Sequence, residues 1–148
     1  MAKTTANNIV LLIDDEIHNM SWMIDYLESR DIGTLTAKNA NEAIQLLDLE
    51  IYRAVIVDLN IPILEPLVNT ALVKGDVYAR YPGLYVAFYA RNRGHRDRQV
   101  VIYSVHRDPT VSAESARLGC TYIIKGRPKE IKGELDSVVS YDPTVCSE

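Results

Sequence analysis

The sequence predicts an α/β fold built on a doubly wound parallel sheet. Short apolar runs at 9–13, 54–57 and 100–103 have the composition of strands that are buried on both faces. Between these runs lie segments whose apolar residues recur at helical spacing. Strands that alternate with helices along a chain are typical of parallel sheets, in which a helix connects each strand to the next.

The first half of the chain shows this alternation clearly. A helix pattern follows the first apolar run from 16 to about 30, and 34–37 is expected to form a short strand. Asn39 and Glu42 have the spacing of a capping box, which predicts that the next helix begins there. That helix leads to the strand that ends at Asp58.

The region 63–98 is less regular. Prolines and glycines divide it into short pieces, among which 84–93 is the best candidate for a helix. The arginine-rich stretch 91–98 is expected to be a solvated loop. The region also holds four tyrosines near helical spacing, which we expect to pack against the fold: Tyr78, Tyr81, Tyr85 and Tyr89.

Regular signals return in the last third of the chain. Asp108 followed by Pro109 predicts a helix start, and Gly119 predicts the end of the same helix. We expect a short strand at 122–124 and a final helix from 129 to about 139.

Composition limits the classes of function. The 148 residues are expected to form one domain, with a core at about 8–140 and a polar tail at 141–148. A net charge of −4 argues against a nucleic-acid partner, because phosphate contacts require basic residues. The two cysteines form neither a disulfide framework nor a metal-binding spacing. With no signal peptide and no apolar run of membrane-spanning length in this sequence, we expect a cytoplasmic protein without a membrane partner.

Side chains suited to phosphate chemistry follow four of the predicted strands. Asp14 and Asp15 follow the first strand, and Asp58 ends the third. Ser104 and Lys125 follow the last two. The carboxyl ends of parallel strands meet at one edge, where three carboxylates would repel one another unless a divalent cation such as Mg²⁺ lay between them. The hydroxyl and the ammonium could then hold the oxygens of a phosphoryl group.

Each of these residues also has a plainer interpretation. Asp15 could cap the first helix, because acids are common in that position. Lys125 could be a surface charge, and Tyr122 a core aromatic residue.

The sequence resembles the receiver (response-regulator) domains of two-component signalling, such as the single-domain chemotaxis response regulator. The matching residues are Leu12 to Glu16, Val57 to Pro62, Ser104, and Tyr122 to Lys125. The match runs in order from about residue 8 to 140, which is most of the chain. The resemblance implies a flavodoxin-like receiver fold with five parallel strands in the order 2-1-3-4-5.

The resemblance also implies a phosphorylation site and a metal site. Asp58 would be the phosphoacceptor and would attack the phosphorus atom of a phosphohistidine. Mg²⁺ would be bound by Asp15 directly, by Asp14 through a water, by Asp58, and by the backbone carbonyl of Asn60.

Three further roles follow from the resemblance. Ser104 and Lys125 would contact the phosphoryl group, with Ser104 moving toward it. Tyr122 would be the switch aromatic residue that turns inward when Ser104 moves. His106 lies where the family tunes its rate of dephosphorylation.

The sequence departs from the family pattern in three places. Val105 follows Ser104 where the family has a small residue, which could restrict the site. Gly126 replaces the proline that usually follows the lysine, so the cis-proline bond of the family is in doubt. The distance from Asp58 to Ser104 is longer than usual, and we place an insertion at about 63–82.

These features predict a stand-alone receiver rather than an enzyme, with self-phosphorylation and self-dephosphorylation at Asp58 as its only chemistry. Its phosphoryl donor would be a histidine kinase or a histidine phosphotransfer protein. No room remains for an output domain after about residue 140, so output is expected through binding of another protein. The binding face would be the last two helices with the last strand, or the insertion. A homodimer is also possible for a protein of this class.

Two alternatives come from other classes of protein. The first is a degenerate receiver that binds a partner constitutively without phosphorylation, which Val105, Gly126 and the insertion favour. The second is a phosphohydrolase of the haloacid-dehalogenase type. That chemistry requires a second acid two residues after the nucleophile, and Asn60 occupies this position.

Overall fold

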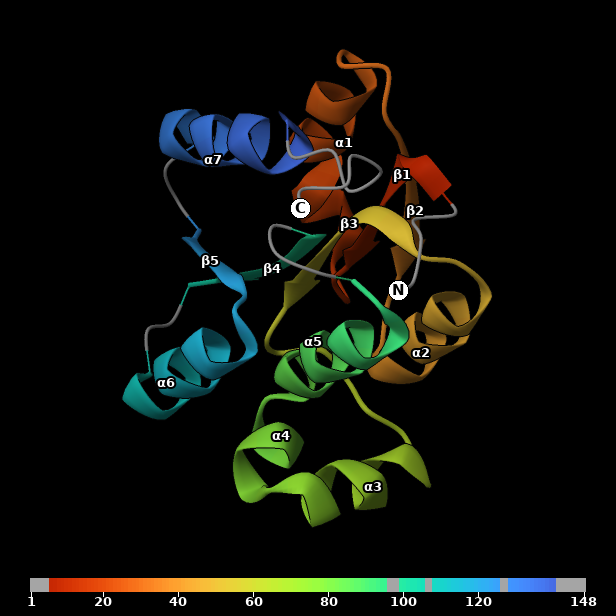
Figure 1. Ribbon diagram of the computed structural model, residues 1–148, viewed down its shortest axis with the longest axis vertical. Helices are drawn as coiled ribbons and strands as arrows, with labels where there is room; N and C mark the ends of the chain where they lie inside the picture. Colours follow the sequence, from red (N-terminus) through yellow and green to blue (C-terminus); the bar gives the residue numbers. More distant parts are fainter. Residues whose placement is uncertain (1–5, 96–98, 106–107, 126–127, 141–148) are drawn as a thin grey trace, which may run out of the picture.

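The chain folds around a five-stranded parallel sheet with the strand order β2-β1-β3-β4-β5 (Figure 1). The computed structural model describes residues 6–95, 99–105, 108–125 and 128–140. The strands are β1 (Ala6–Ile13), β2 (Gly33–Ala37), β3 (Tyr52–Asp58), β4 (Val100–Ser104) and β5 (Thr121–Ile124). The predicted fold class and strand order are therefore confirmed.

The central strands are buried on both faces, as their apolar runs predict. In β1, Leu11 and Ile13 pack in one cluster of buried side chains, whereas Val10 and Leu12 pack in another. β3 is divided between the same two clusters in the same way. Because successive side chains of a strand point to opposite faces, each face of the sheet has its own core.

Helices cover both faces of the sheet. One core includes side chains of α1 (Ser21–Glu28) and α7 (Pro128–Ser140). The other includes side chains of α2 (Ala40–Leu49), α5 (Pro82–Arg93) and α6 (Pro109–Leu118). Figure 1 shows α1 and α7 together on one side of the sheet, with α2 and α5 side by side on the other.

The predicted helix boundaries are confirmed at α2 and α6. At α2, the Asn39 side chain accepts a hydrogen bond from the Glu42 backbone N–H at 2.8 Å, while Glu42 accepts one from the Lys38 N–H. Asp108 caps α6 by accepting hydrogen bonds from two backbone N–H groups in its first turn. Gly119 ends α6 in the left-handed conformation, with φ of 72°.

The first helix is shorter than the sequence pattern predicts. Residues Ile17–Met20 form a 3₁₀ helix, η1, and the α-helix begins only at Ser21. The N-cap position of η1 is Glu16, which has no side-chain capping hydrogen bond. Asp15 is therefore not the cap of this helix, and its plainer interpretation is wrong.

In the part that the structure describes, the connection between β3 and β4 contains three α-helices. They are α3 (Leu67–Lys74), α4 (Asp76–Arg80) and α5. Helix α5 packs against β3, β4 and α2, whereas α3 and α4 lie beyond α5 at the end of the molecule (Figure 1). The two short helices thus lie within the segment 63–82, where the sequence predicts an insertion.

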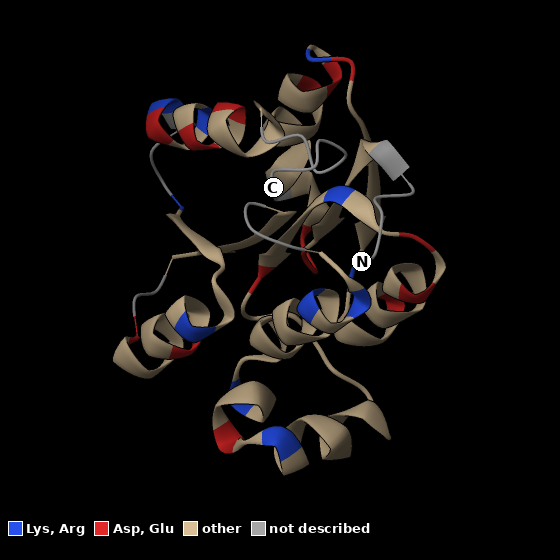
Figure 2. Cartoon of the chain, in the orientation of Figure 1, with Lys and Arg blue, Asp and Glu red and all other residues tan. Residues whose placement is uncertain are grey.

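The prediction of a solvated basic loop at 91–98 is wrong for its first half. Arg91 and Arg93 belong to the last turn of α5 and donate hydrogen bonds to backbone carbonyls at the C-terminal ends of α6 and α2 respectively. His95 is 1% exposed. Figure 2 shows basic residues of α5 beside acidic residues of α2. Residues 96–98 lie outside the described part.

Candidate functional site

The sheet brings three carboxylates together. β1 and β3 are paired in register up to Ile13 and Val57, so the residues that follow these two positions lie at the same edge. Asp14, Asp15 and Asp58 each offer an oxygen atom within 4.8 Å of the others. Asp14 and Asp58 are buried, at 2% and 8% exposure, whereas Asp15 is exposed.

Lys125 brings a positive charge to the two buried acids. Its Nζ lies 3.0 Å from Oδ2 of Asp58 and 3.5 Å from Oδ2 of Asp14. The Lys125 backbone N–H donates to the Ser104 carbonyl at 3.0 Å, which holds the residue after β5 against the end of β4. Burial alone would lower the pKa of Lys125, but the hydrogen bond and the attraction of the two carboxylates outweigh it, and the pKa is raised. Lys125 is therefore an ammonium at neutral pH.

Local turns orient the two buried carboxylates. Oδ1 of Asp14 accepts a hydrogen bond from the Glu16 N–H at 2.9 Å, and Oδ1 of Asp58 accepts one from the Asn60 N–H at 3.2 Å. Each acid thus holds one oxygen on its own backbone turn and directs the other toward Lys125. These two backbone turns therefore fix the orientation of both carboxylates.

The donor set fits a hard divalent cation. Among the described residues, the three carboxylates lie together and the Lys125 ammonium pairs with two of them, so the cluster retains negative charge that a divalent cation would neutralise. Carboxylate oxygens are preferred by Mg²⁺, which usually takes one or two of them and keeps several waters. Asn60, whose carbonyl was predicted as a further ligand, lies two residues beyond Asp58 and is exposed.

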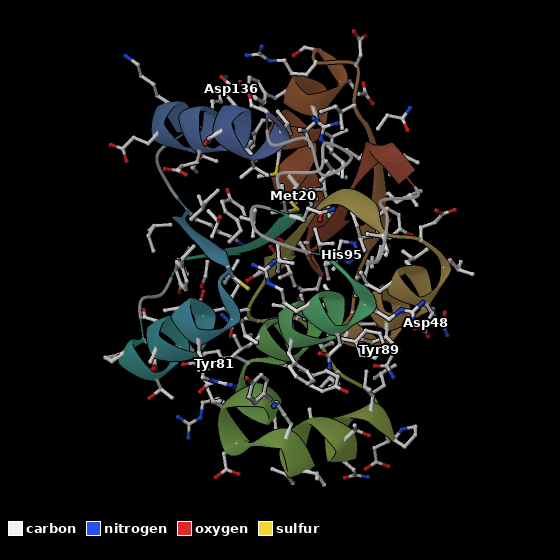
Figure 3. The ribbon with its side chains drawn as sticks, in the orientation of Figure 1. Met20, Asp48, Tyr81, Tyr89, His95 and Asp136 are labelled. Carbon is white, nitrogen blue, oxygen red and sulfur yellow. The ribbon has the colours of Figure 1, made fainter. Side chains whose placement is uncertain are left out.

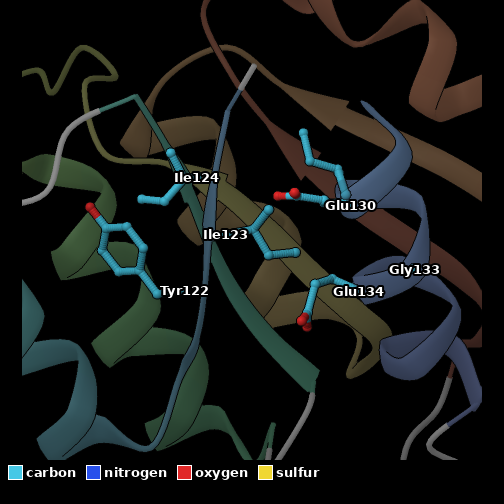
Figure 4. A pocket seen from close by; sticks show the side chains of 7 residues that line it. Tyr122, Ile123, Ile124, Glu130, Gly133 and Glu134 are labelled. Carbon is cyan, nitrogen blue, oxygen red and sulfur yellow. The ribbon is translucent and has the colours of Figure 1, made fainter. Parts of the chain in front are cut away.

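Ser104 and Tyr122 lie on the two strands that complete the sheet edge. Ser104 is fully buried at the end of β4 and is aligned with Ile124 of β5. Tyr122 is half-buried, aligned with Ile102, and packs against the same core as α5 and α6. Tyr122 lines an open groove of about 720 Å³ together with Glu130 and Glu134 of α7, and Figure 4 shows its ring on the opposite side of β5 from these two glutamates.

The sequence departures are only partly visible. The Val105 side chain is 61% exposed, so it is not buried beside Ser104. His106 and Gly126 lie outside the described residues.

Sequence reasoning missed one residue at this site, Gly83. Its backbone N–H donates to the Leu59 carbonyl at 3.0 Å. A Cβ atom at Gly83 would lie 2.0 Å from the carbonyl oxygen of Asp58, which no real structure tolerates. The first turn of α5 therefore rests directly on the backbone of Asp58 and Leu59. The available signal was a glycine immediately after a helix-starting proline, which we interpreted only as a break.

Comparisons with known proteins give matches in structure but not in sequence. No protein-family model matches the chain, and no curated protein matches its sequence. Among solved structures, a CheY-like response regulator receiver domain protein from Methanospirillum hungatei JF-1 matches with a TM-score of 0.69 and 16% identity, over 91% of this chain and 95% of that one. The non-phosphorylated HemR receiver domain from Leptospira biflexa matches with a TM-score of 0.69 and 19% identity, over 90% and 94%.

The chain has the fold of a response-regulator receiver domain. A third match to this receiver fold is the response regulator TrrA from Thermotoga maritima in complex with Mg²⁺-BeF, with a TM-score of 0.65 and 19% identity over 88% of this chain and 98% of that one. A two-component response regulator from Clostridium difficile also matches, with a TM-score of 0.67 and 17% identity over 90% of this chain and 96% of that one. In the described part of the chain, no helix combines the length and apolar character needed to span a membrane.

Proposed function

We propose that this protein is a phosphorylation-dependent receiver that accepts a phosphoryl group on Asp58 with Mg²⁺. The observation that carries the proposal is that side chains from the C-terminal ends of β1, β3 and β5 come together at one site. There, the Lys125 ammonium lies 3.0 Å from Asp58, and oxygens of Asp14 and Asp15 lie within 4.8 Å of an Asp58 oxygen. A metal site alone would not require the lysine beside the acceptor.

The residues present account for the chemistry of the transfer. A carboxylate oxygen of Asp58 would attack the phosphorus atom of a phosphohistidine, the P–N bond would break, and the histidine nitrogen would leave with the electron pair and take up a proton. Mg²⁺ would neutralise charge on the phosphoryl oxygens, held by Asp14, Asp15, Asp58 and the carbonyl of Asn60. Positioning and charge stabilisation supply nearly all the catalysis in such transfers.

Lys125 and Ser104 would serve the phosphorylated form. The ammonium that now pairs with Asp58 can pair with a phosphoryl oxygen in its place, because it reaches the carboxylate from the next-but-one strand. Ser104 lies at the end of the strand between them and would move so that its hydroxyl donates a hydrogen bond to the same group. Tyr122 would follow that movement, and His106 would tune the rate of hydrolysis.

We infer that the phosphoryl donor is a histidine kinase or a histidine phosphotransfer protein, and that the output is the binding of another protein. A homodimer would be one form of such output. The exposed side chains of Leu72 and Val73 on α3, at 52% and 88%, mark the inserted helices as a second binding face beside α6, β5 and α7.

The test is phosphorylation by a small-molecule donor. Incubation with acetyl phosphate and Mg²⁺ is expected to add one phosphoryl group to the wild type, seen as a mass shift that base treatment removes. Asp58→Asn should remain unmodified. Asp25→Asn, which removes an exposed carboxylate on α1, is the matched control and should be modified like the wild type.

An unmodified wild-type protein would overturn the proposal. In that case the constitutive, phosphorylation-independent binding module is the better description. Modification of Asp58→Asn to the same extent as the wild type would place the acceptor elsewhere.

A further inference from the structure

The β3–β4 connection forms a closed loop whose two ends meet at the proposed acceptor. At its start, the Pro62 carbonyl accepts a hydrogen bond from the Ala40 N–H at the beginning of α2. Leu64 and Asn41 then exchange two hydrogen bonds, with Leu64 N–H donating at 2.8 Å and the Asn41 amide donating at 3.3 Å. At its end, Gly83 rests on the backbone of Asp58 and Leu59. We call residues 62–82 the strap.

The strap reaches across to α6 through two tyrosine hydroxyls. The Tyr78 hydroxyl donates to Glu114 at 2.6 Å and accepts from Arg117 at 3.2 Å, and Arg117 also pairs with Glu114 at 2.7 Å. Tyr78 is only 3% exposed, and its bond to Glu114 is partly buried. The Tyr81 hydroxyl donates to Oδ2 of Asp108 at 3.2 Å. Figure 3 shows Tyr81 between α4 and α6.

The contact partner of Tyr81 is also the cap of α6. Oδ1 of Asp108 accepts from the backbone N–H groups of Thr110 and Val111, while its other oxygen accepts from Tyr81. Asp108 lies only four residues after Ser104, the residue that is proposed to move. The 3.2 Å distance is already long for an O–H···O bond, so a small displacement of the α6 start would break it.

The strap is held to α5 as well, so it cannot simply follow α6. The Tyr78 ring lies edge-on to Phe88, with 6.0 Å between their centroids, and the Lys74 ammonium lies 4.1 Å from the Phe88 centroid. α5 in turn is seated on Asp58 through Gly83. A shift of α6 relative to β3 is therefore a shift relative to the strap.

We propose that the strap is a built-in restraint that holds α6 in its unphosphorylated position through Tyr78 and Tyr81. The proposal rests on the proposed function, because the movement that it restrains is that of Ser104 toward a phosphoryl group on Asp58. Bonds present in only one of two conformations shift the equilibrium toward that conformation by their free energy. The strap thus sets the threshold at which phosphorylation changes the α6 surface.

The test removes the two hydroxyls and leaves the rings. The variants are Tyr78→Phe, Tyr81→Phe and the double variant, and the ligand is beryllofluoride with Mg²⁺, a stable mimic of an aspartyl phosphate. Each substitution is expected to tighten beryllofluoride binding by about threefold to tenfold, which is the effect of one hydrogen bond lost only from the unliganded state. The control is Tyr89→Phe. It removes the 2.6 Å bond from Tyr89 to Asp48, which joins α5 to α2 and not to α6, and should bind like the wild type (Figure 3).

A second measurement separates the strap from the phosphorylation chemistry. In the unliganded protein, amide hydrogen exchange within 109–118 is expected to be faster in the double variant than in the wild type or in Tyr89→Phe. If exchange there is unchanged, or if the variants bind beryllofluoride no more tightly than Tyr89→Phe, the restraint is overturned while the proposed function stands. If neither the wild type nor any variant binds beryllofluoride, the proposed function fails and the restraint fails with it.

Discussion

At the scale of single residues, the close approach of Gly83 to the acceptor backbone gives a sharp prediction. Gly83→Ala places a methyl group where only 2.0 Å separates it from the Asp58 carbonyl oxygen, so α5 must move away from β3. Overpacking of this kind costs about 1–3 kcal/mol. We expect the free energy of unfolding in urea to fall by that amount.

Gly133 provides the matched control for this substitution. It lies within α7, and a Cβ atom there would meet nothing within 4 Å. Gly133→Ala should therefore stabilise the protein by about 0.5–1 kcal/mol, because alanine loses less conformational freedom in a helix. If both substitutions change the free energy of unfolding equally, α5 does not rest on the backbone of Asp58 and Leu59.

The charge of the acidic cluster gives a second prediction at the residue scale. If Mg²⁺ binds there, its addition stabilises the folded state, by about 3 kcal/mol at a hundredfold excess over Kd. Asp14→Asn keeps the shape of the side chain but removes one negative charge from a group that is 2% exposed. We expect this variant to lose most of the Mg²⁺-dependent rise in Tm, whereas Asp25→Asn retains it. A full Mg²⁺ response in Asp14→Asn would remove Asp14 from the metal site.

At the scale of elements, α5 organises the helices on its side of the sheet through its last turn. Arg91 Nε donates to the Leu118 carbonyl at 2.8 Å, and the same guanidinium also donates to Gly119 at the end of α6. Carbonyls at a helix C-terminus lack partners within the helix, so a cation that donates to them stabilises that end. Arg91→Met is expected to reduce the free energy of unfolding by about 1–3 kcal/mol and to speed amide exchange in the last turn of α6. Lysine cannot donate to several carbonyls in the same fork geometry, so the free energy of unfolding of Arg91→Lys should lie between those of Arg91→Met and the wild type. If Arg91→Met has the same free energy of unfolding as the wild type, the hydrogen bonds from Arg91 to the end of α6 do not stabilise the protein.

The elements also show what the sequence could predict. The strands were predictable because a fully buried strand needs an uninterrupted apolar run, and 54–57 and 100–103 lie inside β3 and β4. The helices with capping residues, at Asn39 and Asp108, were located nearly to the residue. The last turn of α5 was not predictable. In the sequence, arginines that donate hydrogen bonds to distant backbone carbonyls cannot be distinguished from arginines in a solvent-exposed loop.

The same distinction applies to the candidate site. Asp14, Asp58 and Lys125 could be placed together from sequence because parallel strands bring their carboxyl ends to one edge. Gly83 could not, because its role depends on how closely α5 approaches β3. The strap contacts of Tyr78 and Tyr81 were equally hidden. Packing of the tyrosines was expected from their spacing, but their carboxylate partners lie more than two dozen residues away in the chain.

At the scale of the whole molecule, a buried histidine links the pH of the solution to global stability. His95 Nε2 accepts a hydrogen bond from the Tyr52 N–H at 2.9 Å, and Nδ1 lies 3.1 Å from the Ala90 carbonyl. This pattern requires a neutral ring, protonated on Nδ1. The ring also stacks on Tyr52, so it joins the start of β3 to the end of α5. Protonation of Nε2 would break the bond to β3 and place a charge in the core.

Burial is the main reason that the pKa of His95 is lowered, from 6.5 to about 4, and the nearby arginines lower it further. Because the unfolded chain binds a proton more readily than the folded one, the stabilising contribution of the neutral ring is complete above about pH 6.5 and is lost as the pH falls toward 4. The loss is about 3 kcal/mol, at about 1.4 kcal/mol per unit by which the pKa is displaced.

His95→Gln offers an uncharged donor and acceptor. The free energy of unfolding in urea should therefore decline less between these pH values than in the wild type. His18→Gln, which changes an exposed histidine, should keep the wild-type decline. If His95→Gln loses as much stability on acidification as the wild type, acid sensitivity in this range arises elsewhere in the molecule.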